Sequence, residues 1–173
     1  MHLETERLIL RNVRVEDAED TFPLRHSEFV MQYNCMKPVT MDAYRAMLAR
    51  NQNADGWLHL ELKDSGRVIG MVGWGEDQIR YQVNAVNIDY YLGKPYARQG
   101  YMSEALRALI RYLFEEKSAE LVSARVFGEN IASQALLKKL GFTLEGTLRK
   151  GLRTYDGRAH EDRLYSLLKE EFV

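Results

Sequence analysis

The chain has 173 residues, with 24 lysines and arginines against 25 aspartates and glutamates, and therefore a net charge of −1. This length favours one hydrophobic core, and the balanced charge argues against a nucleic-acid partner, which would require a basic surface. The single cysteine, Cys35, excludes an internal disulfide, and no apolar run reaches the roughly 20 residues that a membrane-spanning helix needs. Because residues 1–7 also lack the layout of a secretion signal, the sequence predicts a cytoplasmic protein without a membrane partner.

The first half of the chain predicts a strand, two helices and then a pair of strands. Residues 7–11 are typical of a strand, and a helix is expected from Val15 because acidic side chains occupy its first turn. A second helix is expected after Thr40, whose hydroxyl suits the N-cap position. Residues 57–62 and 68–74 follow as the two strands of a hairpin, joined by a short polar turn.

The second half alternates strands and helices before it ends in two further strands. The expected elements are a strand at residues 86–92, a helix from 103 to about 117, a strand at 121–127, a helix at 130–140, and strands at 142–148 and 163–168. Gly141 is expected to cap the second of these helices. This order predicts one α/β domain with a mixed sheet. An alternative separates about the first fifty residues as a helical subdomain, although no flexible linker follows them.

The most informative segment, residues 90–106, combines the end of a strand, a basic turn that contains Gly100, and the start of an amphipathic helix. The first turn of a helix has backbone N–H groups without helical acceptors, and the helix dipole adds partial positive charge there. Glycine lets a ligand approach the backbone closely. The segment is therefore expected to bind an anion, and a phosphate or pyrophosphate is the natural ligand.

Four segments in order carry a resemblance to a known family. They are Leu3–Arg11, Arg98–Ala105, Asn130–Ser133 with Leu140–Phe142, and Leu144–Arg149 with Asp156–Gly157. They resemble the opening strand, the pyrophosphate loop, the next helix and the C-terminal hairpin of the GNAT superfamily of acyl-CoA-dependent N-acetyltransferases, in its RimJ/RimL-like, ribosomal-protein branch. The resemblance implies one GNAT-type domain over residues 1–173. It also implies a mixed, mostly antiparallel sheet of about seven strands, about four flanking helices, and a splay between the fourth and fifth strands.

The resemblance further implies an enzyme. Acetyl-CoA would be the cosubstrate, and a primary amine of a protein or peptide N-terminus, or of a small molecule, would attack it directly; no metal is expected. Because Asn87 and Leu137 replace a glutamate and a tyrosine common in the family, a non-catalytic acyl-CoA-binding or sensing domain is the alternative. A nucleotide-binding enzyme is disfavoured because the sequence has no dinucleotide fingerprint. A homodimer is common among members of the family, and the sequence leaves the oligomeric state open.

By the same resemblance, the cosubstrate contacts two regions of the chain. The pantetheine arm would bind the backbone near Tyr91 and Leu92, and the pyrophosphate would bind the N–H groups of residues 98–103. The binding residues so implied are Tyr91, Leu92, Arg98, Gln99, Gly100, Tyr101, Met102, Ser103, Asn130 and Ser133. Lys94 or Arg98 would add a direct charge contact.

Ser133 and Asp89 are the catalytic candidates. The serine at the position of Ser133 in this branch lies near the cofactor sulfur, where it would protonate or hydrogen-bond the thiolate; the alternative is a surface serine bonded to a backbone carbonyl. Asn130, one helical turn earlier, would bind the pantetheine amides, cap the helix, or do both. Asp89 alternates with Asn87 and Tyr91 on a strand face expected to look into the acceptor cleft, where it would act as the base or anchor the amine. Its alternative is a salt-bridged or solvated aspartate.

Other reactive side chains are expected to be structural more often than catalytic. His59 lies in an alternating strand, and His160 lies beside two acidic residues. Glu61 and Glu76 are further candidates for the base on neighbouring strands. Cys35 has no adjacent histidine and no helix start at its position, so it is not expected to act as a nucleophile.

Overall fold

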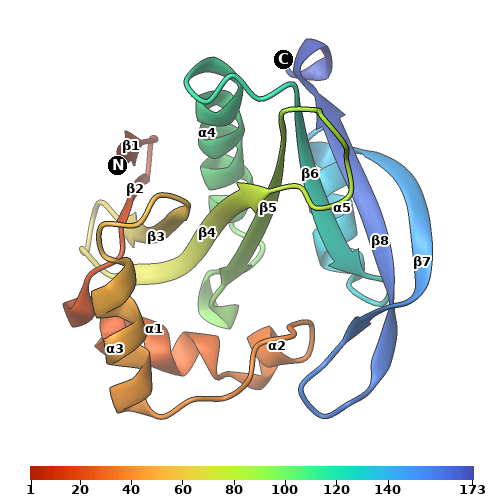
Figure 1. Cartoon of the computed structure of the whole chain (residues 1–173). Helices are drawn as coiled ribbons and strands as arrows, with labels where there is room; N and C mark the ends of the chain where they lie inside the picture. The colour runs from red at the N-terminus through yellow and green to blue at the C-terminus, as the bar shows by residue number, and fades with distance from the viewer. The chain divides into compact units, whose positions relative to one another are not determined.

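The computed structural model describes residues 1–173, which form two compact units (Figure 1). The first unit consists of residues 1–73 and 90–108, and the second of residues 74–89 and 109–173. Three elements belong partly to each unit: β4 (Val68–Glu76), β5 (Ala85–Leu92) and α4 (Tyr101–Glu115). No helix of the structure has the length and apolar character that crossing a membrane requires.

The first unit contains a series of antiparallel strands. β1 (His2–Glu4) pairs with β2 (Leu8–Asn12), β2 pairs with β3 (Trp57–Leu62), and β3 pairs with β4. Leu8 and Leu10 of β2 lie opposite Leu62 and Leu60 of β3, and all four are buried. Side chains along a strand alternate between its two faces, so leucines at every second position supply one apolar face. The pairing of β2 with β3 also places the N-terminal residues in the same unit as the hairpin, not in a separate subdomain.

α1 (Ala18–Arg25) and α3 (Met41–Asn51) contribute side chains to a second apolar cluster in the first unit. The other helices of this unit are η1 (Val15–Asp17), α2 (Glu28–Met31), η2 (Lys94–Tyr96) and the first half of α4. α3 begins after Thr40 as predicted, because the Thr40 hydroxyl accepts the N–H of Ala43 at 3.3 Å. Val13, Tyr44 and Leu48 are buried together in the core of this cluster. α1 and α3 lie side by side at the lower left of Figure 1.

The second unit contains one parallel and two antiparallel strand pairs. β5 pairs in parallel with β6 (Leu121–Phe127), β6 pairs with β8 (Ala159–Leu168), and β8 pairs with β7 (Thr143–Arg153). α5 (Ile131–Lys139) and η3 (Lys169–Glu171) complete this unit, and β7 and β8 form the long hairpin on the right of Figure 1. The pairing of β5 with β6 ends at Ile88 and Ala124. Asp89 is therefore the first residue of β5 without a partner residue on β6.

The predicted α/β class, with a mixed and mostly antiparallel strand arrangement, is confirmed. β3 and β6 have the predicted bounds, and the end of the β5–β6 ladder at Ile88 agrees with the predicted splay. Eight strands occur instead of about seven, because residues 2–4 pair with β2 as a short extra strand. α2 is also additional, and α4 begins at Tyr101, earlier than the predicted start at residue 103.

Candidate functional site

The predicted anion-binding turn is a loop with two left-handed residues before α4. β5 ends at Leu92, η2 follows, and Arg98 (φ +63°) and Gly100 (φ +86°) have positive φ angles. Glycine adopts such an angle without steric cost, whereas a residue with a Cβ, such as Arg98, loses about 1–2 kcal/mol. The carbonyl of Gly100 accepts the N–H of Glu104 at 3.0 Å, which begins the hydrogen bonding of α4.

The backbone N–H groups of residues 98–103 donate to no carbonyl or side chain of the protein. Residues 101–103 form the first turn of α4, where the helix dipole adds partial positive charge. Lys94 and Arg98 are exposed on the same loop. A contiguous run of free donors beside a glycine and two cations meets the requirements of a phosphate or diphosphate group. We call residues 98–103 the donor loop.

The side chains of the donor loop have different surroundings. Met102 is 7% exposed, so its side chain belongs to the core and only its backbone can serve a ligand. Gln99 Nε2 donates to the carbonyl of Pro95 at 2.8 Å and stabilises the turn itself. Ser103 is half-buried in the first turn of the helix. The loop therefore offers an anion mainly its backbone, with Arg98 as the exposed side-chain cation.

Tyr91 and Leu92 are the last residues of β5, and their backbone lies very close to Gly70 of β4 in the first unit. A Cβ atom on Gly70 would lie 2.4 Å from the carbonyl oxygen of Tyr91, so only glycine permits this approach. Burial raises the pKa of Tyr44, whose side chain shares a hydrogen bond with Tyr91 and donates to Thr21 Oγ at 2.9 Å. The side chain of Tyr91 is thus engaged with the helical cluster, and its backbone remains the part relevant to a ligand.

One face of β5 and β6 in the second unit is polar. The parallel register places Asn87 beside Ser123, and strand alternation then places Asp89 and Arg125 on the same face, just past the last strand pair. Ser123 Oγ donates to Asp77 Oδ2 at 2.6 Å and lies 3.5 Å from Asn87 Oδ1. Sequence reasoning placed Asn87 and Asp89 correctly on one strand face but did not find the residues of β6 that share it.

The side chain of Asp89 has neither a hydrogen bond nor an ion pair within the protein, which removes the salt-bridged alternative. The residue is exposed, but desolvation by the surrounding protein disfavours the charged carboxylate and raises the pKa of Asp89 above the usual value for aspartate. A solvent-accessible carboxylate with a raised pKa is a better proton acceptor than an ordinary surface aspartate. Its position therefore suits either a base or an anchor for a cationic amine.

This unit contains two buried carboxylates, Asp77 and Asp162. Sequence reasoning missed Asp77 and considered Asp162 only as one of the acidic residues beside His160, where a solvated position was expected. Burial alone would raise the pKa of Asp77, but hydrogen bonds from Ser123 and from nearby backbone N–H groups hold it below its usual range. Asp162 is fully buried; Arg125 Nε donates to its Oδ2 at 2.6 Å, and its Oδ1 has no partner. In the register of β6 and β8, Arg125 lies opposite Leu164 and Asp162 lies opposite Phe127, so the two charges meet diagonally across the strands. The sequence alone does not give this register.

Asn130 caps α5, which was one of its two expected roles; the other was to bind the pantetheine amides. Its Oδ1 accepts the backbone N–H of Ser133 at 3.1 Å, and its Nδ2 donates to no group of the protein. The amide nitrogen is therefore available to a ligand while the oxygen holds the helix start. Ser133 is half-buried and has polar partners of its own, and Leu137 is fully buried.

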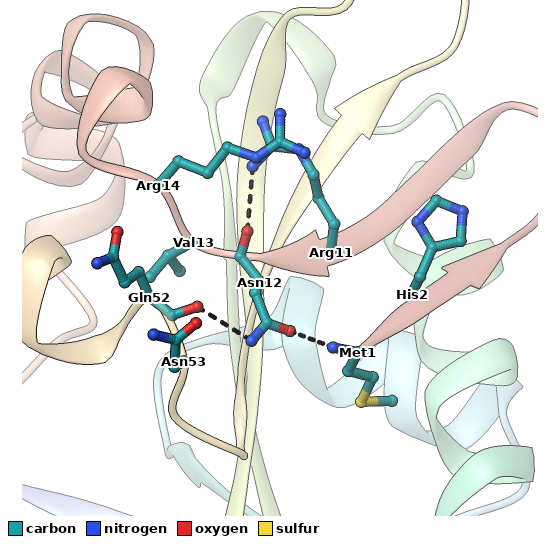
Figure 2. A pocket seen from close by; sticks show the side chains of 8 residues that line it. All are labelled: Met1, His2, Arg11, Asn12, Val13, Arg14, Gln52 and Asn53. Atoms are coloured by element: carbon teal, nitrogen blue, oxygen red, sulfur yellow. Dashed lines mark hydrogen bonds between the residues drawn. The ribbon is translucent and has the colours of Figure 1, made fainter.

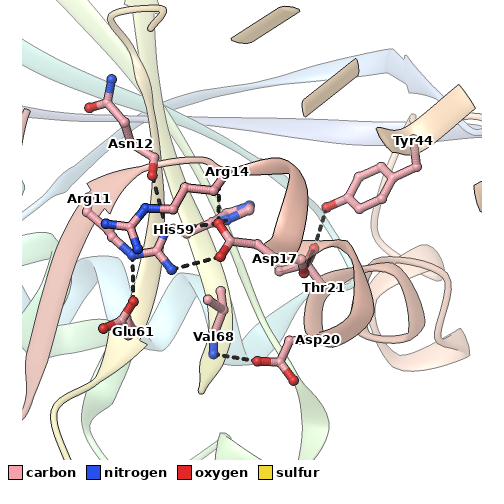
Figure 3. Close-up of polar contacts among 10 residues, drawn as sticks. All are labelled: Arg11, Asn12, Arg14, Asp17, Asp20, Thr21, Tyr44, His59, Glu61 and Val68. Atoms are coloured by element: carbon pink, nitrogen blue, oxygen red, sulfur yellow. Dashed lines mark hydrogen bonds and ion pairs between the residues drawn. The ribbon is translucent and has the colours of Figure 1, made fainter. Parts of the chain in front are cut away.

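The weaker sequence candidates of β3 belong to a buried polar network of the first unit (Figure 3). His59 Nδ1 lies 2.6 Å from Asp17 Oδ2, Arg11 donates to both oxygens of Asp17 at 2.7–2.8 Å, and Arg11 Nε donates to Glu61 at 2.5 Å. Burial alone would raise the pKa of Asp17, but the hydrogen bonds from Arg11 and His59 outweigh it and hold that pKa far below its usual range. His59 and Glu61 are thus structural. His160, in the second unit, lies 3.3 Å from exposed Glu129.

A separate pocket of about 390 Å³ lies at the start of the first unit (Figure 2). It is lined by Met1, His2, Arg11, Asn12, Val13, Arg14, Gln52 and Asn53. None of these residues belongs to the predicted site. Its most buried cation, Arg11, is already neutralised by Asp17 and Glu61. The chemistry of a phosphate ligand therefore favours the donor loop over this pocket.

Comparisons with known proteins agree with this chemistry. The sequence model of the acetyltransferase (GNAT) domain matches residues 7–143. The chain is 31% identical to the uncharacterized N-acetyltransferase p20 of Bacillus licheniformis over 99% of this chain and 98% of that protein. It is 28% identical to the [ribosomal protein uS5]-alanine N-acetyltransferase of Escherichia coli over 100% and 93%. The crystal structure of a GNAT-family acetyltransferase from Bacillus anthracis superposes with a TM-score of 0.88, at 23% identity over 99% and 100% of the two chains. The predicted use of acetyl-CoA and an amine is thereby confirmed, and the chain belongs to the family of GNAT acetyltransferase domains.

Proposed function

We propose that residues 1–173 act as one N-acetyltransferase domain in which an amine attacks the thioester of acetyl-CoA directly. The observation that carries the proposal is the donor loop: consecutive free N–H groups lie at the start of α4, beside Gly100. The diphosphate of coenzyme A is the anion that such a loop suits in an acetyltransferase. Two expectations from the sequence, a cytoplasmic location and a homodimer, stay predictions.

Three predicted regions of the chain would each bind a different part of acetyl-CoA. The N–H groups of residues 98–103 would hold the diphosphate, with Lys94 or Arg98 as a charged contact. The backbone of Tyr91 and Leu92 would pair with the pantetheine amides as an added strand does. The free Nδ2 of Asn130 would donate to a pantetheine carbonyl, which its cap bond through Oδ1 allows.

The reaction needs a neutral amine, and Asp89 is the proposed proton acceptor. An ammonium group bound near Asp89 would give its proton to the carboxylate, directly or through water, and the freed lone pair would form a bond to the thioester carbon. The C–S bond then breaks: Ser133 would donate a proton to the departing thiolate and regain one from the attacking nitrogen, which loses its second proton as the amide forms. The support for Asp89 is geometric: it is exposed, unpaired, and first past the end of the β5–β6 ladder.

An α-amino group is the acceptor that this machinery favours. The pKa of an α-amino group is about 7.7–8.0, whereas that of a lysine side chain is about 10.4, so the α-amine is far easier to deprotonate at neutral pH. Asn87 stands where the family often has glutamate, which leaves one carboxylate, Asp89, for this work. A peptide or protein N-terminus, as in the name of the E. coli relative, or a small α-amine would meet this condition. Incubation of acetyl-CoA with a panel of peptides and small amines, read by mass spectrometry, tests the acceptor class.

Replacement of Gly100 tests the donor loop. Any side chain there must adopt a φ of +86°, and its Cβ would lie 3.2 Å from Arg7 Nη2. We expect Gly100→Val to reduce coenzyme A affinity at least about 100-fold, because the strained loop can no longer direct its donors. Isothermal titration calorimetry with coenzyme A measures the loss.

Gly157→Val is the matched control. Gly157 has a φ of +87°, but its Cβ would meet nothing within 4 Å, and it lies in the turn of the β7–β8 hairpin. This variant carries the same backbone strain without touching the donor loop, so its affinity should stay near that of the unaltered protein. Equal affinity of all three proteins for coenzyme A would overturn the proposed site.

A further inference from the structure

Arg7 connects the opening segment of the chain to the donor loop. Its backbone N–H donates to Glu104 Oε1 at 2.8 Å, and its Nε donates to Glu104 Oε2 at 2.7 Å. Its Nη1 donates to the carbonyl of Gln99 at 3.0 Å, and its guanidinium lies 4.3 Å from the centre of the Tyr101 ring. One side chain thus contacts the turn, the first residue of α4 and the acidic residue of its first turn.

The bond to the Gln99 carbonyl orients the next N–H group. All peptide bonds of the chain are trans, and in a trans peptide the C=O and N–H bonds point in opposite directions. When Arg7 holds the Gln99 carbonyl, the N–H of Gly100 must therefore point away from Arg7. That N–H is one of the free donors of the loop. Arg7 consequently sets the direction of a donor that it does not touch.

The ion pair also removes an unfavourable charge from the start of α4. The carboxylate of Glu104 suits the positive end of the helix dipole, but alone it would repel a diphosphate bound to the same turn. Arg7 neutralises Glu104 through Nη2 at 2.7 Å, and Thr5 Oγ1 donates to Glu104 at 2.5 Å. The carboxylate side chain is 17% exposed, so this neutralisation acts in a partly desolvated place, where electrostatic effects are stronger than in water.

We propose that Arg7 is a positioning residue for the diphosphate of coenzyme A: it holds the Gln99 carbonyl and Glu104, and so directs the free N–H groups of the donor loop toward the anion. This inference rests on the proposed function. It gives the opening segment Leu3–Arg11 a role in binding the donor, beyond the strand pairing of β2.

Arg7→Ala should weaken coenzyme A binding about tenfold, which corresponds to about 1.4 kcal/mol. At saturating acetyl-CoA, kcat should stay within about twofold, because Arg7 touches no reacting group. The decisive measurement compares acetyl-CoA with acetyl-pantetheine, which has the same thioester but no diphosphate. The variant should lose kcat/KM with acetyl-CoA and match the unaltered protein with acetyl-pantetheine.

Arg45→Ala is the matched control, because Arg45 is 46% exposed against 40% for Arg7 and also pairs with a glutamate of the first unit, Glu19. Arg45→Ala should leave kcat/KM unchanged with both acetyl-CoA and acetyl-pantetheine. Should Arg7→Ala fail to fold, Arg7→Lys tests the same point: it keeps the charge, but one ammonium group cannot reproduce the fork that holds Gln99 and Glu104, so affinity should still fall.

The role of Arg7 would be overturned if Arg7→Ala lost kcat/KM equally with acetyl-CoA and acetyl-pantetheine. It would also be overturned if an Arg7 variant behaved like Arg45→Ala. The Gly100→Val variant separates this failure from failure of the proposed function. If Gly100→Val loses coenzyme A affinity and the Arg7 variants do not, the donor loop binds the diphosphate without help from Arg7. If neither loses affinity, the proposed site itself is wrong.

Discussion

At the scale of single residues, Ser133 and Asp89 carry the proposed chemistry for different reasons. Ser133 takes its place from the cap of α5: Asn130 Oδ1 accepts its backbone N–H, which orients the first turn. Asp89 takes its place from the strand register, which leaves it without a partner residue on β6. Asp89 has no side-chain partner, and the cap of α5 uses the backbone of Ser133, so variants of both residues keep these features of the fold.

Ser133→Ala should slow the chemical step about tenfold or more while coenzyme A affinity stays near normal. The cap of α5 survives this change, because its donor is the backbone N–H of residue 133 and not the hydroxyl. Single-turnover kinetics with acetyl-CoA and an active peptide measures the step. Ser65→Ala, at an exposed turn position, is the control. Unchanged turnover in Ser133→Ala would assign the proton donor elsewhere.

Asp89→Asn should reduce kcat/KM about 100-fold and remove the acidic limb of its pH profile. A base works only when deprotonated, so activity should fall as the pH decreases through the raised pKa of Asp89, which lies above the usual value of about 3.9. Asp64→Asn, at an exposed turn, is the control: it should keep kcat/KM and the acidic limb of the pH profile unchanged.

The same variant has a stability signature that a structural aspartate would not show. A raised carboxylate pKa means that the charged form destabilises the folded state at neutral pH. Asp89→Asn should therefore be at least as stable as the unaltered protein at pH 7, as measured by urea unfolding. A large loss of stability would identify Asp89 as a structural residue instead.

At the scale of elements, the network of Arg11, Asp17 and His59 joins β2, η1 and β3 (Figure 3). Because hydrogen bonds hold the pKa of Asp17 far below its usual value, this carboxylate stabilises the fold at every pH above about 3.9. That stability is lost as the pH falls from there toward the lowered pKa. The network thus predicts acid sensitivity of the first unit.

Asp17→Asn should cost about 3–5 kcal/mol of unfolding free energy at neutral pH, because it leaves Arg11 and His59 buried without their shared anion. It should also flatten the decline of stability below about pH 4, since the group that titrates there is gone. Urea unfolding at a series of pH values measures both effects. An equally steep acid decline in the variant would show that other carboxylates cause it.

Elements with a strong local signal could be predicted from the sequence, and those that depend on a partner could not. β3 and β6 are apolar runs bounded by turns, and α3 starts at a threonine cap, so the local sequence suffices. β1 is only three residues long and exists because it pairs with β2. α2 has four residues, too few for a recognisable period.

At the scale of the whole molecule, the family relationship explains why a chain with few identities to its structural relatives keeps their fold. Core positions accept many apolar side chains if volume and patterning persist, whereas the donor loop needs a glycine at one position and an unpaired backbone around it. The similarity is spread over nearly the full chain and includes both compact units. The choice of acceptor, in contrast, does not follow from the fold, because a few side chains at a site can set its specificity on one and the same fold.

The sequence by itself determined the α/β class, the family and the donor loop, because strand and helix periods are local and the loop is a run of consecutive backbone groups. Only the tertiary structure decided which side chains support that loop and which carboxylates are free. Arg7 meets Glu104 across 97 residues, Ser123 meets Asp77 across 46, and Asp17 meets His59 across 42. Contacts between residues so far apart are made by strand pairing and packing, and no local pattern of residue types specifies them.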